Sequence, residues 1–261
     1  MLSGSLPAKD PTDDDEGSMR LSMARSYGTS AVAVEGWLRR FVHMLVLGVA
    51  LIGGPASGFA QGFVQTAAAP RQQPIKMVVL GDSLSAGLGL PESAAFPEQL
   101  KKTLENNGIK ADMINAGVSG DTSSGGRDRL DWSVPDGTEA VILELGANDA
   151  LRGTDPSVTR AALSDILTRL KARGIAVLLC GMVAPPNLGS DYAARFNSIY
   201  PELSKSFGVP LYPFFLQGVA ADQRLNQADG MHPTAAGVAV IVSNMLPTVE
   251  AFVSSISGQR S

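Results

Sequence analysis

Ser83 has the surroundings most favourable to nucleophilic chemistry in this chain. It stands in the segment Gly81–Ser85, Gly-Asp-Ser-Leu-Ser, directly after the apolar run 75–80. A serine is a weak nucleophile at neutral pH unless a base accepts its proton, and histidine is the usual base. The sequence must therefore supply a histidine and a group that orients it.

Histidine is scarce in this chain. Only His43 and His232 are present, and His43 lies in an N-terminal segment that we expect to be removed. His232 is therefore the predicted base. Asp229 stands three residues earlier, on a turn tightened by Gly230 and Pro233, so its carboxylate can reach the imidazole and fix its tautomer. The alternative is that Asp229 and His232 only cap the helix that follows Pro233.

Attack on an ester also creates an oxyanion, and donors fixed in advance at that point often supply the largest catalytic contribution. Three groups are candidates: the backbone N–H of Ser83, the backbone N–H of Gly120 and the side-chain amide of Asn148. Taken singly, Gly120 and Asn148 are more typical of turns. They form a convincing set only if the fold brings them to Ser83.

Other chemistries fail on residue type or spacing. The chain has no Gly-x-x-x-x-Gly-Lys-Ser/Thr, no Gly-x-Gly-x-x-Gly and no Gly-x-Ser-x-Gly segment. With one cysteine, and no Cys-x-x-Cys or His-x-x-x-His, we expect no internal disulfide, no metal site and no cofactor. Cys180 is predicted to be a buried thiol at a strand end. Asp82 is predicted to cap the next helix rather than to act as a nucleophile.

The composition is that of an ordinary globular protein. Hydrophobic residues make up 44% and charged residues 18% of the 261 residues, which is enough apolar material for a core. The formal net charge of −4, without a cluster of lysine and arginine, argues against a nucleic-acid partner. The sequence indicates no obligatory protein partner.

Residues 1–60 are predicted to be a leader outside the folded domain. Residues 1–40 are polar and are expected to be disordered or removed. Two arginines then precede an apolar stretch and a small-residue pattern ending at Ala60, which is typical of a secretory signal peptide cleaved after Ala60. The usual length of such peptides makes Met19 and Met23 alternative translation starts. We expect the protein in the periplasm or outside the cell; the alternative is that residues 41–60 remain as a membrane anchor, the expected route of any membrane contact.

From residue 75 onward, apolar strand-like runs alternate with helical patterns. Strands are expected at 75–80, 110–115, 140–145, 175–180 and 210–212, and helices at 96–106, 125–132, 156–173, 192–207 and 234–254. Unbroken apolar runs are buried on both faces, and their alternation with helices implies right-handed crossovers. After a linker at 61–74, the sequence predicts one three-layer α/β domain over 75–257, with a mainly parallel sheet of five strands. Ligands bind at the carboxyl ends of such strands, and Ser83, Gly120 and Asn148 all follow strands there.

Four segments then appear in the order found in the SGNH, or GDSL-type, hydrolases: Gly81–Ser85, Gly120–Thr122, Gly146–Asp149 and Asp229–Pro233. From about residue 75 to residue 247 the chain resembles that family, and within it the bacterial acyl-CoA thioesterase I, arylesterase and lysophospholipase group. The resemblance implies a flavodoxin-like fold with strand order 2-1-3-4-5.

The resemblance also assigns the site. It implies Ser83 as nucleophile, His232 as base, Asp229 as its orienter, and Ser83, Gly120 and Asn148 as oxyanion donors. The expected activity is a serine esterase that hydrolyses aryl or alkyl esters through an acyl-enzyme, with thioesters and lysophospholipids as further substrates. The alternatives are a carbohydrate or peptidoglycan O-acetylesterase and a non-catalytic binding domain on the same fold.

Two loops are expected to hold the small acyl ester substrate. The family resemblance implies a mobile substrate-side loop at 145–153, which includes Leu151, and a loop at 184–189, with Pro186 and Asn187, that seats the acyl chain. Leu84 is one of several apolar side chains near these loops, and they suggest an acyl group of short to medium length.

Overall fold

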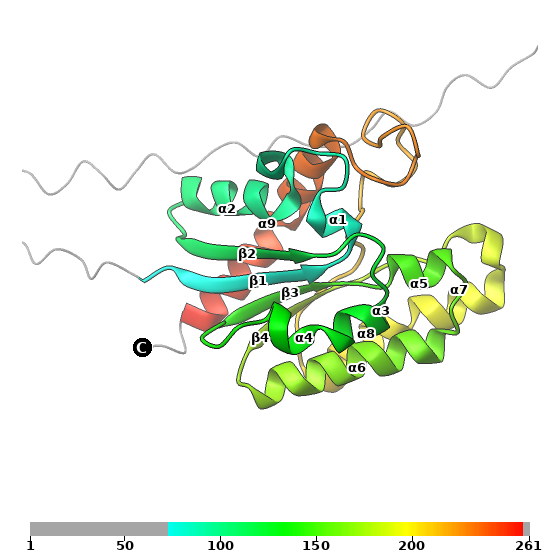
Figure 1. Ribbon diagram of the computed structural model, residues 1–261, viewed down its shortest axis with the longest axis horizontal. Coiled ribbons are helices and arrows are strands. Elements are labelled where there is room, and N and C mark those ends of the chain that lie inside the picture. The colour runs from blue at the N-terminus through cyan, green and yellow to red at the C-terminus, as the bar shows by residue number, and fades with distance from the viewer. Residues whose placement is uncertain (1–72, 258–261) are drawn as a thin grey trace, which may run out of the picture. The chain divides into compact units, whose positions relative to one another are not determined.

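Five strands form the centre of the protein. The computed structural model describes residues 73–257; the predicted leader, the alternative anchor at 41–60 and nearly all of the linker lie outside them. The strands are β1 (Ile75–Gly81), β2 (Ala111–Gly117), β3 (Ala140–Glu144), β4 (Ala176–Cys180) and β5 (Leu211–Tyr212). They form one parallel sheet in the order β2-β1-β3-β4-β5 (Figure 1), which confirms the predicted topology.

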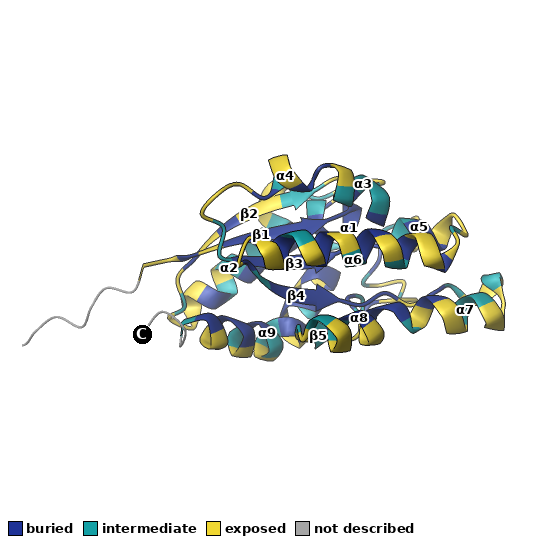
Figure 2. Ribbon diagram, turned by 90° about the horizontal axis from the view of Figure 1, so that it is seen from below, coloured by how far each residue is buried: buried dark blue, intermediate teal, exposed yellow. Residues whose placement is uncertain are grey.

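Helices cover both faces of the sheet. They are α1 (Ser83–Ala86), α2 (Phe96–Asn106), α3 (Ser123–Asp128), α4 (Leu130–Ser133), α5 (Ala147–Leu151), α6 (Pro156–Ala172), α7 (Ser190–Asn197), α8 (Ile199–Phe207) and α9 (Ala235–Ser257), with 3₁₀ turns η1 (Glu92–Ala94) and η2 (Pro186–Leu188). Helices α2 and α9 pack together on one face, and α3, α6 and α8 lie on the other (Figure 1). Figure 2 shows the buried strands β1, β3 and β4 between helices whose outer sides are exposed, which is the predicted three-layer arrangement, while the edge strand β2 has exposed residues.

The strand register brings the carboxyl ends of four strands level with one another. Gly81 at the end of β1 pairs with Gly117 of β2 and with Glu144 of β3, and Glu144 pairs with Cys180 of β4. The segments that follow these strands therefore leave the sheet from one edge, where α1 and α5 also lie (Figure 1). This edge is where the sequence places its candidate site.

Two predicted helices are each divided in two, and a predicted loop is helical. The expected helix 125–132 is α3 followed by α4, because the backbone leaves the helical conformation at Arg129 (φ −98°, ψ 6°). The expected helix 192–207 divides into α7 and α8 at Ser198, since Pro201 has no N–H to donate to the carbonyl of Asn197. Residues 147–151, expected within a loop, form α5.

Helix α9 is long and apolar enough, by length and composition, to cross a bilayer. Its residues Val238, Ile241 and Met245 are buried in the core, and the helix packs on α2. A core helix has the same composition as a membrane span, so the apolar character of α9 is explained by its packing.

Candidate active site

The turn that carries Ser83 follows directly from the end of β1. Asp82 is the N-cap of α1, and its Oδ1 accepts a hydrogen bond from the backbone N–H of Leu84 at 3.0 Å, which confirms its predicted capping role. The helix ends after one turn at Gly87, whose φ of +79° is a left-handed conformation that favours glycine. Ser83 is thereby held at the strand end with 7% of its surface exposed.

The structure brings the three predicted catalytic residues together. His232 Nε2 lies 2.9 Å from Ser83 Oγ, and His232 Nδ1 lies 2.6 Å from Asp229 Oδ2. Asp229 Oδ1 also accepts the backbone N–H groups of Met231 at 2.9 Å and His232 at 3.0 Å. The alternative capping role is wrong, because α9 begins at Ala235 and the hydroxyl of Thr234 accepts the N–H of Gly237 instead.

The charge of Asp229 fixes the tautomer of His232. Hydrogen bonds from the backbone N–H groups of His232 and Met231, and then from the His232 ring, lower the pKa of Asp229 to about 2. An ionised carboxylate can only accept, so the neutral imidazole donates from Nδ1 and Nε2 is left to accept the Ser83 hydroxyl proton. This is the arrangement that a serine nucleophile requires.

The two backbone oxyanion candidates are available as donors. Within residues 73–257, no acceptor takes the N–H of Ser83 or of Gly120. Gly120 has a φ of +83°, which explains why the loop has glycine there, and its carbonyl accepts a hydrogen bond from Arg152 of the segment after α5 at 2.8 Å. Gly120 itself does not line the cavity that Ser83 faces.

The third candidate, Asn148 in α5, already has partners for both amide hydrogens. Its Nδ2 donates to Asp82 Oδ2 at 3.1 Å and to the carbonyl oxygen of Asp121 at 2.9 Å. Asn148 therefore lies beside the Ser83 turn as predicted, but it reaches an oxyanion only by exchanging one of these bonds.

Two buried carboxyl groups lie beneath the Ser83 turn, and Glu144 was not predicted as part of the site. Burial raises the pKa of Asp82 to about 6, against the lowering effect of its hydrogen bonds from Leu84 and Asn148. Burial raises the pKa of Glu144 well above its ordinary value, and the negative charge of the nearby Asp82 is the second cause. The one sequence signal for Glu144 is a charged residue inside an otherwise apolar strand.

Arg129 also holds the strand ends, and sequence reasoning missed it too. Its guanidinium donates to Asp121 Oδ2 at 2.5 Å, to the carbonyl of Ala116 at 2.8 Å and to the carbonyl of Gly81 at 2.8 Å. It is 8% exposed. One side chain thus ties the ends of β1 and β2 to the loop that carries Gly120.

The cavity beside Ser83 has a volume of about 310 Å³ and mostly apolar walls. The expected contacts Leu84 and Leu151 line it, as do Met182 and Val183 after β4. The other expected contacts, Pro186 and Asn187, form η2, are exposed and do not line it; Pro185 does. The wall that sequence reasoning missed comes from the segment after β5 and from the catalytic turn: Phe214, Leu216, Ala220, Ala221 and Met231.

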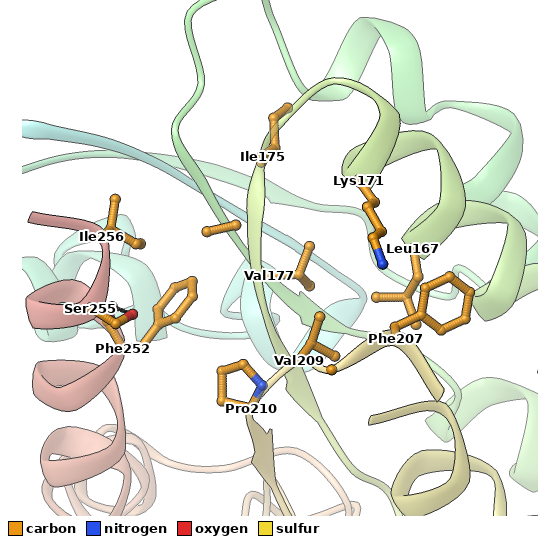
Figure 3. Close-up of a pocket in the computed structure, with 12 residues that line it drawn as sticks. Leu167, Lys171, Ile175, Val177, Phe207, Val209, Pro210, Phe252, Ser255 and Ile256 are labelled. Atoms are coloured by element: carbon orange, nitrogen blue, oxygen red, sulfur yellow. Dashed lines mark hydrogen bonds between the residues drawn. The ribbon is translucent and has the colours of Figure 1, made fainter. Parts of the chain in front are cut away.

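A second cavity, of about 190 Å³, lies at the opposite end of the sheet, where β4 begins (Figure 3). Its walls come from α6, β4, α8 and α9 and include Val177, Phe207 and Phe252. It contains no histidine, and its one hydroxyl, that of Ser255, donates to the carbonyl of Phe252 at 2.6 Å. This cavity therefore lacks a serine–histidine pair like the one at Ser83.

Neither metal nor thiol chemistry has a site in the described part of the chain. Residues 73–257 contain no group of three or more His, Cys, Asp or Glu side chains that could hold a metal ion. Cys180 is fully buried at the end of β4, as predicted. Its burial, and to a lesser extent the nearby Glu144, raises the pKa of the thiol well above the ordinary value. A neutral, inaccessible thiol is not a nucleophile.

Known proteins are similar to this chain in sequence and in fold. The sequence profile of the GDSL-like Lipase/Acylhydrolase family matches residues 79–240. Esterase TesA of Pseudomonas aeruginosa is 39% identical over 175 residues, which are 67% of this chain and 87% of that protein. Thioesterase 1/protease 1/lysophospholipase L1 of Escherichia coli strain K12 is 41% identical over 158 residues, 60% of this chain and 74% of that protein. The crystal structure of AlinE4, an SGNH-hydrolase family esterase, is similar with a TM-score of 0.59 and 44% identity, covering 69% of this chain and 97% of that one. The chain belongs to the GDSL-like lipase/acylhydrolase family.

Proposed function

We propose that this protein is a serine esterase in which Ser83 attacks the ester carbonyl and His232 accepts the proton. The observation that carries this proposal is the continuous set of contacts from Ser83 Oγ to His232 Nε2, 2.9 Å, and from His232 Nδ1 to Asp229 Oδ2, 2.6 Å. Groups in this geometry act as nucleophile, base and orienter in acyl transfer on unrelated folds.

The reaction proceeds in two halves. In the first, Ser83 Oγ bonds to the carbonyl carbon, the Nε2 of His232 takes the hydroxyl proton, and the N–H groups of Ser83 and Gly120 stabilise the oxyanion. The imidazolium then gives its proton to the leaving alcohol as the ester bond breaks, which leaves an acyl group on Ser83. In the second half, the oxygen of a water molecule bonds to the acyl carbon as His232 removes its proton. The imidazolium then returns that proton to Ser83 Oγ as the bond between Oγ and the acyl carbon breaks, and the carboxylic acid leaves.

The cavity favours esters with short to medium acyl groups. A volume of about 310 Å³ is near the lower end for ligand pockets, and the walls supplied by Leu84, Leu151 and Met182 are apolar. We rank aryl and alkyl esters first. Thioesters and lysophospholipids follow, because the names of the similar proteins include thioesterase and lysophospholipase activities. Sugar O-acetyl groups are disfavoured by an apolar wall.

The test is hydrolysis of p-nitrophenyl esters from acetate to palmitate by the full chain and by Ser83→Ala. We expect Ser83→Ala to lose the activity and Ser164→Ala, in α6 and not among the residues that line the cavity, to keep it. Equal hydrolysis by the wild type and Ser83→Ala would refute the assignment. A profile confined to acetate, with turnover of acetylated sugars, would favour the O-acetylesterase.

We further propose that the protein is exported and cleaved after Ala60. The support is the sequence pattern of residues 39–60, a basic flank, an apolar stretch and a small-residue cleavage pattern. The N-terminal sequence of the exported protein should begin at Gln61. Residues 41–60 retained on a membrane-bound protein would favour the anchor instead.

A further inference from the structure

Glu144 is a carboxyl group in the core to which the proposed reaction gives no role. It ends β3, the middle strand of the sheet, and its side chain is fully buried. Acidic residues are almost never fully buried unless they are paired with a base. The partners of Glu144 are not basic: Oε2 accepts the hydroxyl of Ser85 at 2.6 Å and the backbone N–H of Asp82 at 3.3 Å.

This burial opposes folding. Oε1 has no hydrogen-bond partner and is the one buried side-chain oxygen or nitrogen within residues 73–257 in that condition. An unsatisfied buried polar atom loses its hydration and gains nothing in return. An apolar side chain of similar length would fill the same space without this loss, so stability alone does not explain a glutamate here.

Both partners of Glu144 belong to the turn that carries Ser83. Asp82 stands immediately before the nucleophile and Ser85 two residues after it. The approach is close: a Cβ on Gly81 would lie 2.5 Å from Glu144 Oε2 and 2.3 Å from Ser85 Oγ, so only glycine allows it. The hydrogen bonds therefore fasten the turn on both sides of Ser83 to the central strand.

The raised pKa of Glu144 suits this role, because it favours the uncharged carboxyl. Burial, with the nearby Asp82 as the second cause, raises the pKa of Glu144 well above its ordinary value, although the hydrogen bonds from Ser85 and Asp82 act in the opposite direction. A neutral carboxyl can lie beside the Asp82 carboxylate without repulsion. It still accepts the two hydrogen bonds, whereas a second negative charge would repel Asp82, which holds Asn148.

We propose that Glu144 is a positioning residue whose two hydrogen bonds hold the 82–85 turn so that the Oγ and the backbone N–H of Ser83 face the substrate. The proposal rests on the proposed function of Ser83. It predicts that activity and stability separate at this position, because the carboxyl opposes folding while it orders the nucleophile.

The experiment compares Glu144→Met, Glu144→Gln and Leu143→Met in the full chain. Leu143 is the matched control, since it precedes Glu144 on β3 and is equally buried but points to the other face of the sheet. Kinetics with p-nitrophenyl butyrate give kcat and KM, and thermal unfolding gives Tm.

We expect Glu144→Met to lower kcat by about 10- to 100-fold, the usual consequence of a misplacement near 1 Å, with KM within about twofold of the wild type. Its Tm should not fall below that of the wild type. Glu144→Gln keeps one oxygen acceptor and should lose less activity. Leu143→Met should retain its kcat.

An unchanged kcat in Glu144→Met, or a loss fully accounted for by unfolded protein, would overturn the proposal. If Glu144→Met does not fold, Ser85→Ala decides, because it removes the hydroxyl hydrogen bond to Glu144 Oε2; an unchanged kcat in Ser85→Ala would then overturn the proposal. Ser83→Ala, assayed alongside, separates the two hypotheses. An active Ser83→Ala refutes the proposed function, whereas an inactive Ser83→Ala with a fully active Glu144→Met refutes only the positioning role.

Discussion

Replacing Arg129 with methionine should destabilise the protein strongly, because this guanidinium joins two strand ends to the loop that carries Gly120. Arg129 donates to the carbonyls of Gly81 and Ala116 and forms an ion pair with Asp121. The side chains of Arg129 and Asp121 are 9% and 19% exposed, so water replaces little of what the substitution removes. After the substitution, the Asp121 carboxylate would be left partly buried without its cation.

The size of the effect follows from burial. Removing one partner of a buried ion pair costs about 3–5 kcal/mol of folding free energy. The carbonyl of Gly81 keeps the N–H of Val118 as a donor at 3.1 Å, so it adds little to this figure. For a domain of this size each kcal/mol lowers Tm by about 2–4 °C, which gives a fall of about 6–20 °C for Arg129→Met.

Thermal unfolding followed by circular dichroism measures this directly, with Arg127→Met as the matched control two residues away. Arg127 pairs with Asp128, but these side chains are 37% and 68% exposed. Exposed pairs contribute at most about 1 kcal/mol, so the control should lose little. Arg129→Lys should fall between the two, since an ammonium group keeps the charge but not the planar fork of donors. A Tm for Arg129→Met within about 2 °C of the control would refute this reasoning.

Three further predictions concern the site. Asp229→Asn should lower kcat for p-nitrophenyl butyrate by about 10⁴-fold, because the amide no longer selects the His232 tautomer that accepts the serine proton. A loss below tenfold would contradict the orienting role of Asp229. The pKa of Asp82 rises from 3.8 to about 6 on folding, so its contribution to stability is largest at low pH and falls as pH rises between these values. Urea unfolding between pH 4 and 6 should therefore show a free energy of unfolding that depends less on pH in Asp82→Asn than in the wild type. Equal pH dependence in the two proteins would contradict the raised pKa of Asp82. Met182→Trp should reduce kcat/KM for the p-nitrophenyl octanoate ester by at least about tenfold relative to the acetate ester, because Met182 lines the cavity and a larger side chain narrows it. An unchanged chain-length profile would show that the acyl chain binds elsewhere.

The predicted contact between Asp229 and His232 is confirmed by the structure. Asp229 and His232 are three residues apart on one turn, so their contact needed no knowledge of the tertiary fold. The parallel sheet was equally accessible, because apolar runs alternate with helical patterns. Ser83 and His232 are 149 residues apart, yet their pairing could be predicted because the part of the chain after residue 60 has one histidine.

The residues missed by sequence reasoning act through distant partners. Glu144 bonds to Ser85 across 59 residues, and Arg129 bonds to Gly81 across 48. No spacing rule links such residues, and each has an ordinary local explanation, as part of a strand or of a helix end. Phe214 and Leu216 were missed for a similar reason, since they follow β5 in a segment without a periodic pattern that the fold alone carries to the cavity.

Asn148 shows how much depends on contacts rather than on residue type. As an amide it was a plausible oxyanion donor, but both its hydrogens are bound, one by the Asp82 carboxylate and one by the carbonyl of Asp121. Hydrogen bonds to charged acceptors are about twice as strong as those between neutral groups, so an oxyanion should displace the Asp121 carbonyl rather than Asp82. Asp121 adjoins Gly120 and is the ion-pair partner of Arg129. If Asn148 released the Asp121 carbonyl, the loop that carries Gly120 would still be held by the ion pair between Arg129 and Asp121.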